Sequence, residues 1–102
     1  MEENIIVIEV LKAAPGKAKE LGKALADIVH ISRQEEGCQK YELFEPVGEE
    51  EEFLVLMQWE TLADLRRHES SEHIEKFVHK YSTLYTDVHQ TEWKKFSTNT
   101  GQ

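Results

Sequence analysis

Two histidines, His68 and His73, stand five positions apart in the segment 68–73, HESSEH. Histidine exchanges protons near neutral pH and is also a common metal ligand. Zinc-binding helices place two histidines four positions apart, whereas a spacing of five turns them about 140° from each other around a continuous helix. The sequence therefore predicts no metal here. The two histidines are either proton acceptors beside a pocket or partners of backbone carbonyls at a helix junction, and both interpretations stay open.

Other side chains with chemical potential have simpler interpretations. Trp59 is either a core aromatic whose indole N–H needs a partner or part of a pocket wall. Cys38 does not lie at a helix N-terminus, where its thiol would be activated, and we interpret it as a small packing residue. The sequence contains no phosphate-binding loop, dinucleotide fingerprint, or Ser or Cys triad signature. These absences argue against nucleotide, flavin and acyl-transfer chemistry.

The first half of the chain predicts a strand, a helix and a hairpin. Residues 5–11 are almost all β-branched and precede Pro15-Gly16, which is typical of a strand and a turn. From Pro15 to Gly37 an amphipathic helix is predicted, because apolar residues recur three and four positions apart, at Ala18, Leu21, Leu25 and Ile28. Residues 39–46 and 53–59 predict two strands joined by a solvated acidic turn that contains Glu49 to Glu52.

The second half predicts two helices and a last strand. Thr61, followed three positions later by Asp64, matches a helix-capping pattern, so a short helix should run to about His68. Ser70 or Ser71 can cap a second helix, whose buried stripe is formed by Ile74, Phe77, Val78 and Tyr81. Residues 85–96 predict the last strand, and we expect residues 97–102 to be a disordered tail.

The order β-α-β-β-α-β is typical of an α+β, ferredoxin-like fold (split βαβ), here a single domain over residues 1–96 with both helices on one face of a sheet. The segments 5–11 and 53–59 are apolar on both faces, although a sheet face in water should be polar. Leaving several such side chains in water would cost a few kcal/mol. We therefore expect a homodimer in which the two sheets face each other.

Composition limits the partners and the compartment. The chain has 102 residues with 12 Lys+Arg and 20 Asp+Glu, a net charge of −8. Nucleic acids and anionic membranes attract basic patches, so we expect no nucleic-acid or membrane partner. The apolar run 5–8 is too short for a signal or a membrane span, and a single cysteine cannot form an intrachain disulfide. We expect a cytoplasmic protein.

Three segments together resemble the antibiotic biosynthesis monooxygenase family, in particular its small quinol-monooxygenase-like members. These are 32–41 (SRQEEGCQKY), 53–60 (FLVLMQWE), and Leu65 with the following His68, Ser71, His73 and Phe77. The likeness spans Ile5 to Phe96. The resemblance implies a dimeric α/β barrel and, for some relatives, oxygenation of phenols or quinols by dioxygen without a metal, flavin or haem.

Such a reaction needs a base with a near-neutral pKa, a group that stabilises an oxyanion, and a dry aromatic-lined pocket. If the resemblance extends to activity, His73 or His68 is the base and Trp59 lines the pocket and donates its N–H. Tyr41 or Arg33 then stabilises the oxyanion. Arg33 also has a structural explanation, because a cation near a helix C-terminus complements the helix dipole.

Two other functions stay open. One is a non-catalytic dimeric protein, either a binder of small ligands or a stress-related protein. The other is haem binding or haem degradation, found in relatives that carry an asparagine in the first strand, a tryptophan in the short helix and a ligating histidine in the next helix. Those positions hold Glu9, His68 and Val78 here, with His79 adjacent to the last, so we expect no cofactor.

Overall fold

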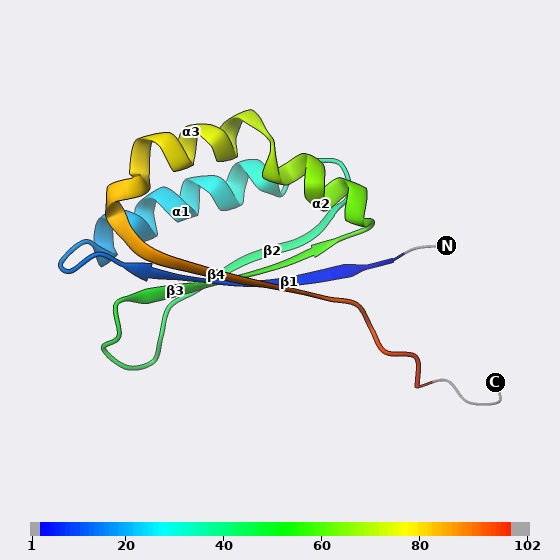
Figure 1. Ribbon diagram of the computed structural model, residues 1–102, viewed down its shortest axis with the longest axis horizontal. Helices are drawn as coiled ribbons and strands as arrows, with labels where there is room; N and C mark the ends of the chain where they lie inside the picture. The colour runs from blue at the N-terminus through cyan, green and yellow to red at the C-terminus, as the bar shows by residue number, and fades with distance from the viewer. Residues whose placement is uncertain (1–2, 99–102) are drawn as a thin grey trace.

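The computed structural model describes residues 3–98, which form a sheet covered on one face by helices (Figure 1). The elements in chain order are β1 (Ile5–Ala13), α1 (Ala18–Ser32), β2 (Cys38–Phe44), β3 (Glu52–Trp59), α2 (Leu62–Glu69), α3 (Glu72–Tyr81), the 3-10 turn η1 (Ser82–Leu84) and β4 (Tyr85–Trp93). Within the described residues, no helix is both long enough and apolar enough to cross a membrane.

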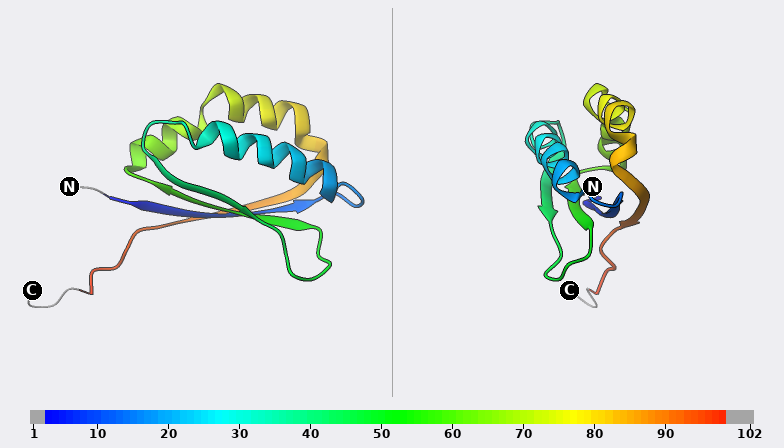
Figure 2. Two further views of the ribbon diagram at one scale, coloured as in Figure 1. Left: turned by 180° about the vertical axis from the view of Figure 1, so that it is seen from behind. Right: turned by 90° about the vertical axis from the view of Figure 1, so that its left-hand side faces the viewer.

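The four strands lie in the order β2-β3-β1-β4, and all three neighbouring pairs are antiparallel. The helices α1, α2 and α3 all lie on the same face of this sheet, as Figure 2 shows from two sides. This arrangement confirms the predicted α+β, ferredoxin-like fold.

Three predicted boundaries are wrong by three residues or more. Helix α1 begins at Ala18 because Pro15 and Gly16 form a turn, and it ends at Ser32, five residues before Gly37. Gly37, which has a φ of 85°, lies instead in the turn immediately before β2. Strand β4 ends at Trp93 instead of residue 96. Residues 97–98 have no regular secondary structure, and the rest of the predicted disordered tail, 99–102, lies outside the described residues.

The core lies between the helices and the inner face of the sheet. Alternate residues of β1 and β3 point into it, including Val7, Val55 and Trp59, each no more than 1% exposed. The intervening residues point to the opposite face, where Ile8 and Val10 of β1 lie beside Leu56 and Leu54 of β3 and are only partly buried. The chain's own helices do not cover that outer face (Figure 2).

The helical segment after β3 breaks at two serines. Thr61 caps α2 as predicted, because its Oγ1 accepts a hydrogen bond from the backbone N–H of Asp64 at 3.1 Å. Ser71 is the N-cap of α3, and its hydroxyl donates to the carbonyl of His68 at 2.7 Å. The chain direction therefore changes between His68 and His73, and this change positions the candidate site.

Candidate functional site

The carboxylate of Glu35 lies between the two histidines. Glu35 belongs to the turn that follows α1, His68 to the last turn of α2, and His73 to the first turn of α3. Glu35 Oε2 is 2.6 Å from Nδ1 of His68 and 3.1 Å from Nε2 of His73. The hydroxyl of Ser32, at the end of α1, is 3.2 Å from the same nitrogen of His73. Three separate segments of the chain thus meet at one carboxylate.

The break between α2 and α3 brings the histidines together. In a continuous helix their spacing would separate them, but here their ring centroids are 5.8 Å apart. Their partners are the Glu35 carboxylate and the Ser32 hydroxyl, and no described residue offers them a backbone carbonyl at hydrogen-bond distance. The histidines are therefore part of a side-chain network at the helix junction.

His68 is fixed on three sides. Its Nδ1–H donates to Glu35, because a carboxylate can only accept. The ring of Trp59 lies 4.7 Å from the ring of His68, centroid to centroid, and the ring of Tyr41 meets it edge-on at 5.5 Å. Burial lowers the pKa of His68, with Glu35 opposing that shift. The neutral ring then carries its lone pair on Nε2, an atom with no hydrogen-bond partner among residues 3–98.

Two adjoining pockets lie between the helices and the inner face of the sheet. The smaller, about 90 Å³, is lined by His68, Glu69 and Gln90 among others. The larger, about 120 Å³, extends between α1 and α3 and is mainly apolar, with walls that include Leu25, Ile28, Phe77, Tyr85 and Val88. Both pockets are lined by Glu9, Tyr41 and Ile74, so they meet at these three residues. An apolar cavity of about 150 Å³ is known to hold a benzene-sized ring.

Sequence reasoning missed Glu9 as a site residue. It lies in the middle of β1 and points to the inner face, where its strand neighbours Val7 and Leu11 are buried. Burial, and then the negative charge of Glu69, raise the pKa of Glu9 to about 7. Among residues 3–98 its carboxylate has neither a hydrogen bond nor an ion pair. The signal was present, because Glu9 is the charged residue at the centre of an otherwise apolar alternation.

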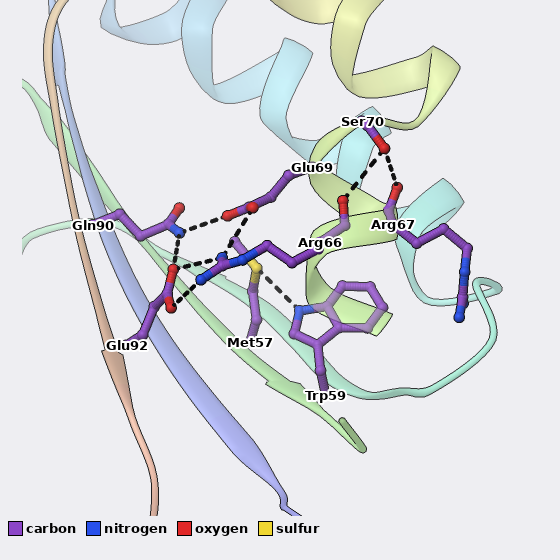
Figure 3. Close-up of polar contacts among 8 residues, drawn as sticks. All are labelled: Met57, Trp59, Arg66, Arg67, Glu69, Ser70, Gln90 and Glu92. Atoms are coloured by element: carbon purple, nitrogen blue, oxygen red, sulfur yellow. Dashed lines mark hydrogen bonds and ion pairs between the residues drawn. The ribbon is translucent and has the colours of Figure 1, made fainter. Parts of the chain in front are cut away.

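A charged network joins α2 to β4 beside the smaller pocket and includes two residues that line it (Figure 3). Arg66 of α2 binds the carboxylate of Glu92 on β4 through two hydrogen bonds of 2.9 Å each, and it also contacts Glu69 at 3.0 Å. Gln90 donates to Glu69 at 2.9 Å and to Glu92 at 3.2 Å. The network joins α2 to the edge strand β4 and fixes Glu69 and Gln90, both of which line the pocket.

The remaining predicted site residues occupy different places. Tyr41 is 3% exposed and lines both pockets, and burial raises the pKa of its phenol, which keeps it protonated. Trp59 is fully buried behind His68, and its indole N–H donates to the sulfur of Met57 at 3.5 Å (Figure 3). Arg33 lines neither pocket. It is the C-cap residue of α1, and its Nε donates to the backbone carbonyl of Tyr41 at 2.9 Å.

The Glu35, His68 and His73 donor atoms lie within 4.8 Å of one another, a spacing that could hold a metal ion. Hydrogen bonds account for the same spacing, because the Glu35 oxygen already lies within hydrogen-bond distance of both rings. Of these three residues, only His68 lines a pocket. His79, the neighbour of the haem-ligand position, is exposed and lines a separate surface hollow on α3.

Comparisons with known proteins agree with this fold. The Bacillus subtilis protein described as "Putative monooxygenase YcnE" is 36% identical over 91 residues, covering 86% of this chain and 96% of that protein. The crystal structure of PA3566 from Pseudomonas aeruginosa has a TM-score of 0.88 and 30% identity, covering 95% of this chain and 98% of the other. SO0527 from Shewanella oneidensis has a TM-score of 0.86 at 22% identity and 93% coverage of both chains, which is a likeness of fold.

The family comparison covers the elements that build the site. The model of the antibiotic biosynthesis monooxygenase family matches residues 4–80, from the start of β1 almost to the end of α3. This range contains Glu9, Glu35 and both histidines. The resemblance seen in the sequence is thereby confirmed, and homologues of this kind support a monooxygenase-like function. The chain belongs to the antibiotic biosynthesis monooxygenase family.

Proposed function

We propose that this protein is a cofactor-independent monooxygenase that oxidises a small phenolic or quinol-like aromatic in the two pockets between the sheet and the helices. The observation that carries the proposal is the presentation of His68. His68 lines the smaller pocket, its Nδ1–H donates to Glu35, and its ring packs against Trp59. Its other ring nitrogen, Nε2, has no hydrogen-bond partner among the described residues. A neutral imidazole held in this way is suited to act as a general base.

The substrate supplies all the electrons of this reaction. A phenol that loses its proton to His68 becomes a phenolate, which gives up an electron to dioxygen far more readily than the neutral ring does. One oxygen atom then enters the ring and the other leaves as water. For a simple phenol, one phenol and one dioxygen give one quinone and one water. No external reductant is required.

The other predicted residues support this step in different ways. His73 is in contact with Glu35 and Ser32 rather than the pockets, and we assign it a positioning role through Glu35. Tyr41 keeps its proton and lines both pockets, so its hydroxyl is suited to stabilise a substrate oxyanion. Arg33 would contribute to substrate binding only indirectly, by holding the backbone of Tyr41.

We also propose that the active form, a single domain through residue 96, is a homodimer in the cytoplasm. The support is the outer face of the sheet, where Ile6, Ile8 and Val10 lie beside Leu54 and Leu56 without a covering layer from residues 3–98. Trp93 and Phe44, at the two edges of the sheet, are 56% and 46% exposed. A second copy packed against this face would remove these side chains from water.

The test is oxygen incorporation under ¹⁸O₂. Purified protein is incubated with 1,4-naphthohydroquinone, oxygen uptake is followed, and the product is analysed by mass spectrometry. We expect one ¹⁸O atom in each hydroxylated product, with a rate reduced about 100-fold in His68→Ala and less in His73→Ala and Trp59→Phe. The matched control His79→Ala changes an exposed histidine on the same helical segment and should keep the full rate.

Other outcomes would contradict the proposal. Equal rates in the wild type, His68→Ala and heat-denatured protein would leave only uncatalysed oxidation. Binding of the quinone without turnover would favour the ligand-binding alternative. A Soret band on titration with hemin, lost in a histidine variant, would favour the haem alternative. Circular dichroism of each variant separates loss of chemistry from loss of folding.

A further inference from the structure

The carboxylate of Glu9 has no role in the proposal above, although it lies where the two pockets meet. It projects from the centre of β1, opposite Gln90 of β4 and Val55 of β3 in the sheet register. Both pockets touch it, together with Tyr41 and Ile74. A molecule that fills either pocket therefore contacts Glu9.

We propose that Glu9 is a second catalytic residue of this pocket, which accepts a proton from a hydroxyl group of the bound aromatic. The inference rests on the proposed function, because it concerns the same pocket and the same class of substrate. It goes further by assigning proton transfer to a residue on the sheet, whereas His68 belongs to the helical layer.

Among residues 3–98, the side chains that line the two pockets around Glu9 include no lysine or arginine that could hold a permanent carboxylate. Strand β2 contributes Tyr41, β4 contributes Tyr85 and Gln90, and α2 contributes His68 and Glu69. The pocket residues from α1 and α3 are apolar. Glu69, engaged by Arg66, adds a negative charge. An unpaired carboxylate in such a place gains a proton easily, which is the property a general base requires.

The two tyrosines complete the pocket chemistry. Burial and the Glu9 charge both raise the pKa values of Tyr41 and Tyr85. Both phenols therefore keep their protons and can donate hydrogen bonds. Glu9 is left as the acceptor in the larger pocket, which His68 does not line. Two proton acceptors can thus act on an aromatic that spans both pockets.

The proton transfer is balanced within the pocket. The substrate O–H bond breaks, its electron pair stays on the substrate oxygen, and the proton forms an O–H bond with the Glu9 carboxylate. The resulting phenolate is the electron donor to dioxygen in the proposed reaction. When the product leaves, Glu9 releases its proton to water.

The experiment compares Glu9→Gln, Glu9→Asp and the control Glu75→Gln, which alters an exposed carboxylate on α3. Oxygen uptake with 1,4-naphthohydroquinone is measured from pH 5.5 to 9. In the wild type, kcat/KM should fall at low pH with an apparent pKa near 7, and that limb should be absent in Glu9→Gln. We expect a loss of about 100-fold in Glu9→Gln, partial recovery in Glu9→Asp and no change in Glu75→Gln.

A second measurement does not depend on turnover. 4-Nitrophenol is titrated into each protein at pH 8, where Glu9 with its pKa of about 7 is ionised and the visible absorbance of the probe reports its phenolate form. Binding to the wild type and to Glu75→Gln should lower the phenolate fraction below that of the free probe, because the Glu9 carboxylate accepts the hydrogen bond of the phenol, and binding to Glu9→Gln should lower it less. Equal phenolate fractions in all three proteins would overturn the role of Glu9. Absence of oxygen uptake by the wild type, with the phenolate difference intact, would instead overturn the oxygenase proposal.

Discussion

Gly37 lies directly against the side chain of Asp64, so that a β-carbon on Gly37 would overlap the Asp64 carboxylate. Asp64 cannot withdraw freely, because it accepts hydrogen bonds from Thr61 at 2.9 Å and from Arg67 at 2.8 Å. This close approach fixes the turn after α1 against the start of α2. The same turn carries Glu35 toward His68.

Gly37→Ala should therefore destabilise the fold through two effects. Its φ of 85° is unfavourable for alanine, and the new methyl group would displace Asp64 from its hydrogen bonds. We expect a loss of roughly 2–4 kcal/mol in urea unfolding. Gly16→Ala is the matched control, because Gly16 has a φ of 77° but no atom within 4 Å of its added β-carbon. That variant should lose only about 1 kcal/mol. Equal losses would mean that contact with Asp64 is unimportant.

Glu9→Gln should change how stability depends on pH. Between pH 4.5 and about 7, the carboxyl of Glu9 holds a proton in the native protein that it has lost in the unfolded chain. The contribution of Glu9 to the free energy of unfolding therefore decreases as the pH rises through this range. Glutamine removes this effect. We expect the variant to be more stable than the wild type at pH 8, by up to about 3 kcal/mol, and nearly equal at pH 4.5. Urea titrations at both pH values measure the difference, and a difference that does not vary with pH would contradict it.

The Arg66–Glu92 pair should couple α2 to β4 only weakly. The contact is bidentate, but the two side chains are 50% and 32% exposed, so water and salt screen it. A double-mutant cycle with alanine should give a coupling energy of at most about 1 kcal/mol, lower still in 1 M salt. The Lys76–Glu72 pair is the control, because its side chains are 76% and 81% exposed, and its coupling should be near zero. A larger coupling for the control pair would refute this ranking.

Leu56→Arg should separate the proposed dimer. Leu56 lies on the outer face of the sheet beside Ile8, where a charged side chain would be unpaired against a second copy. Sedimentation velocity should give a dimer for the wild type and a monomer for this variant. Ile31→Arg is the control, because Ile31 is 47% exposed on α1, in the helical layer, and its variant should remain a dimer. If the wild type and Leu56→Arg have the same molecular mass in solution, sheet-to-sheet packing is contradicted.

Local sequence patterns were enough to predict most of the fold. The β-branched run of β1, the acidic turn between β2 and β3 and the Thr61 cap are short-range features, and the structure confirms each of them. The boundaries failed where tertiary contacts decide. Gly37 looked like a helix terminus, but its conformation serves the packing of a turn against Asp64.

The site was harder to predict because its members come from different elements. The sequence predicted the break at Ser70–Ser71 but not the angle between the two helices, so the approach of His68 to His73 could not be derived from their spacing. Glu35 forms no pattern with either histidine in the sequence, since 33 positions separate it from His68. Glu9 was visible as a charge among apolar residues, but only the register of β1 places it at the pockets.

The position of Glu9 also bears on how β1 finds its partners during folding. Ile6, Ile8 and Val10 are nearly as apolar as Ile5, Val7 and Leu11, so hydrophobicity alone hardly distinguishes the two faces of this strand. A shift of the β1 register by one residue would turn Glu9 toward the apolar outer face of the sheet and place Ile8 and Val10 in the pockets. In a sheet paired in this way, the carboxylate of Glu9 would lie unpaired among Leu54 and Leu56. The charge of Glu9 therefore favours the register of β1 in which this side chain points to the inner face of the sheet.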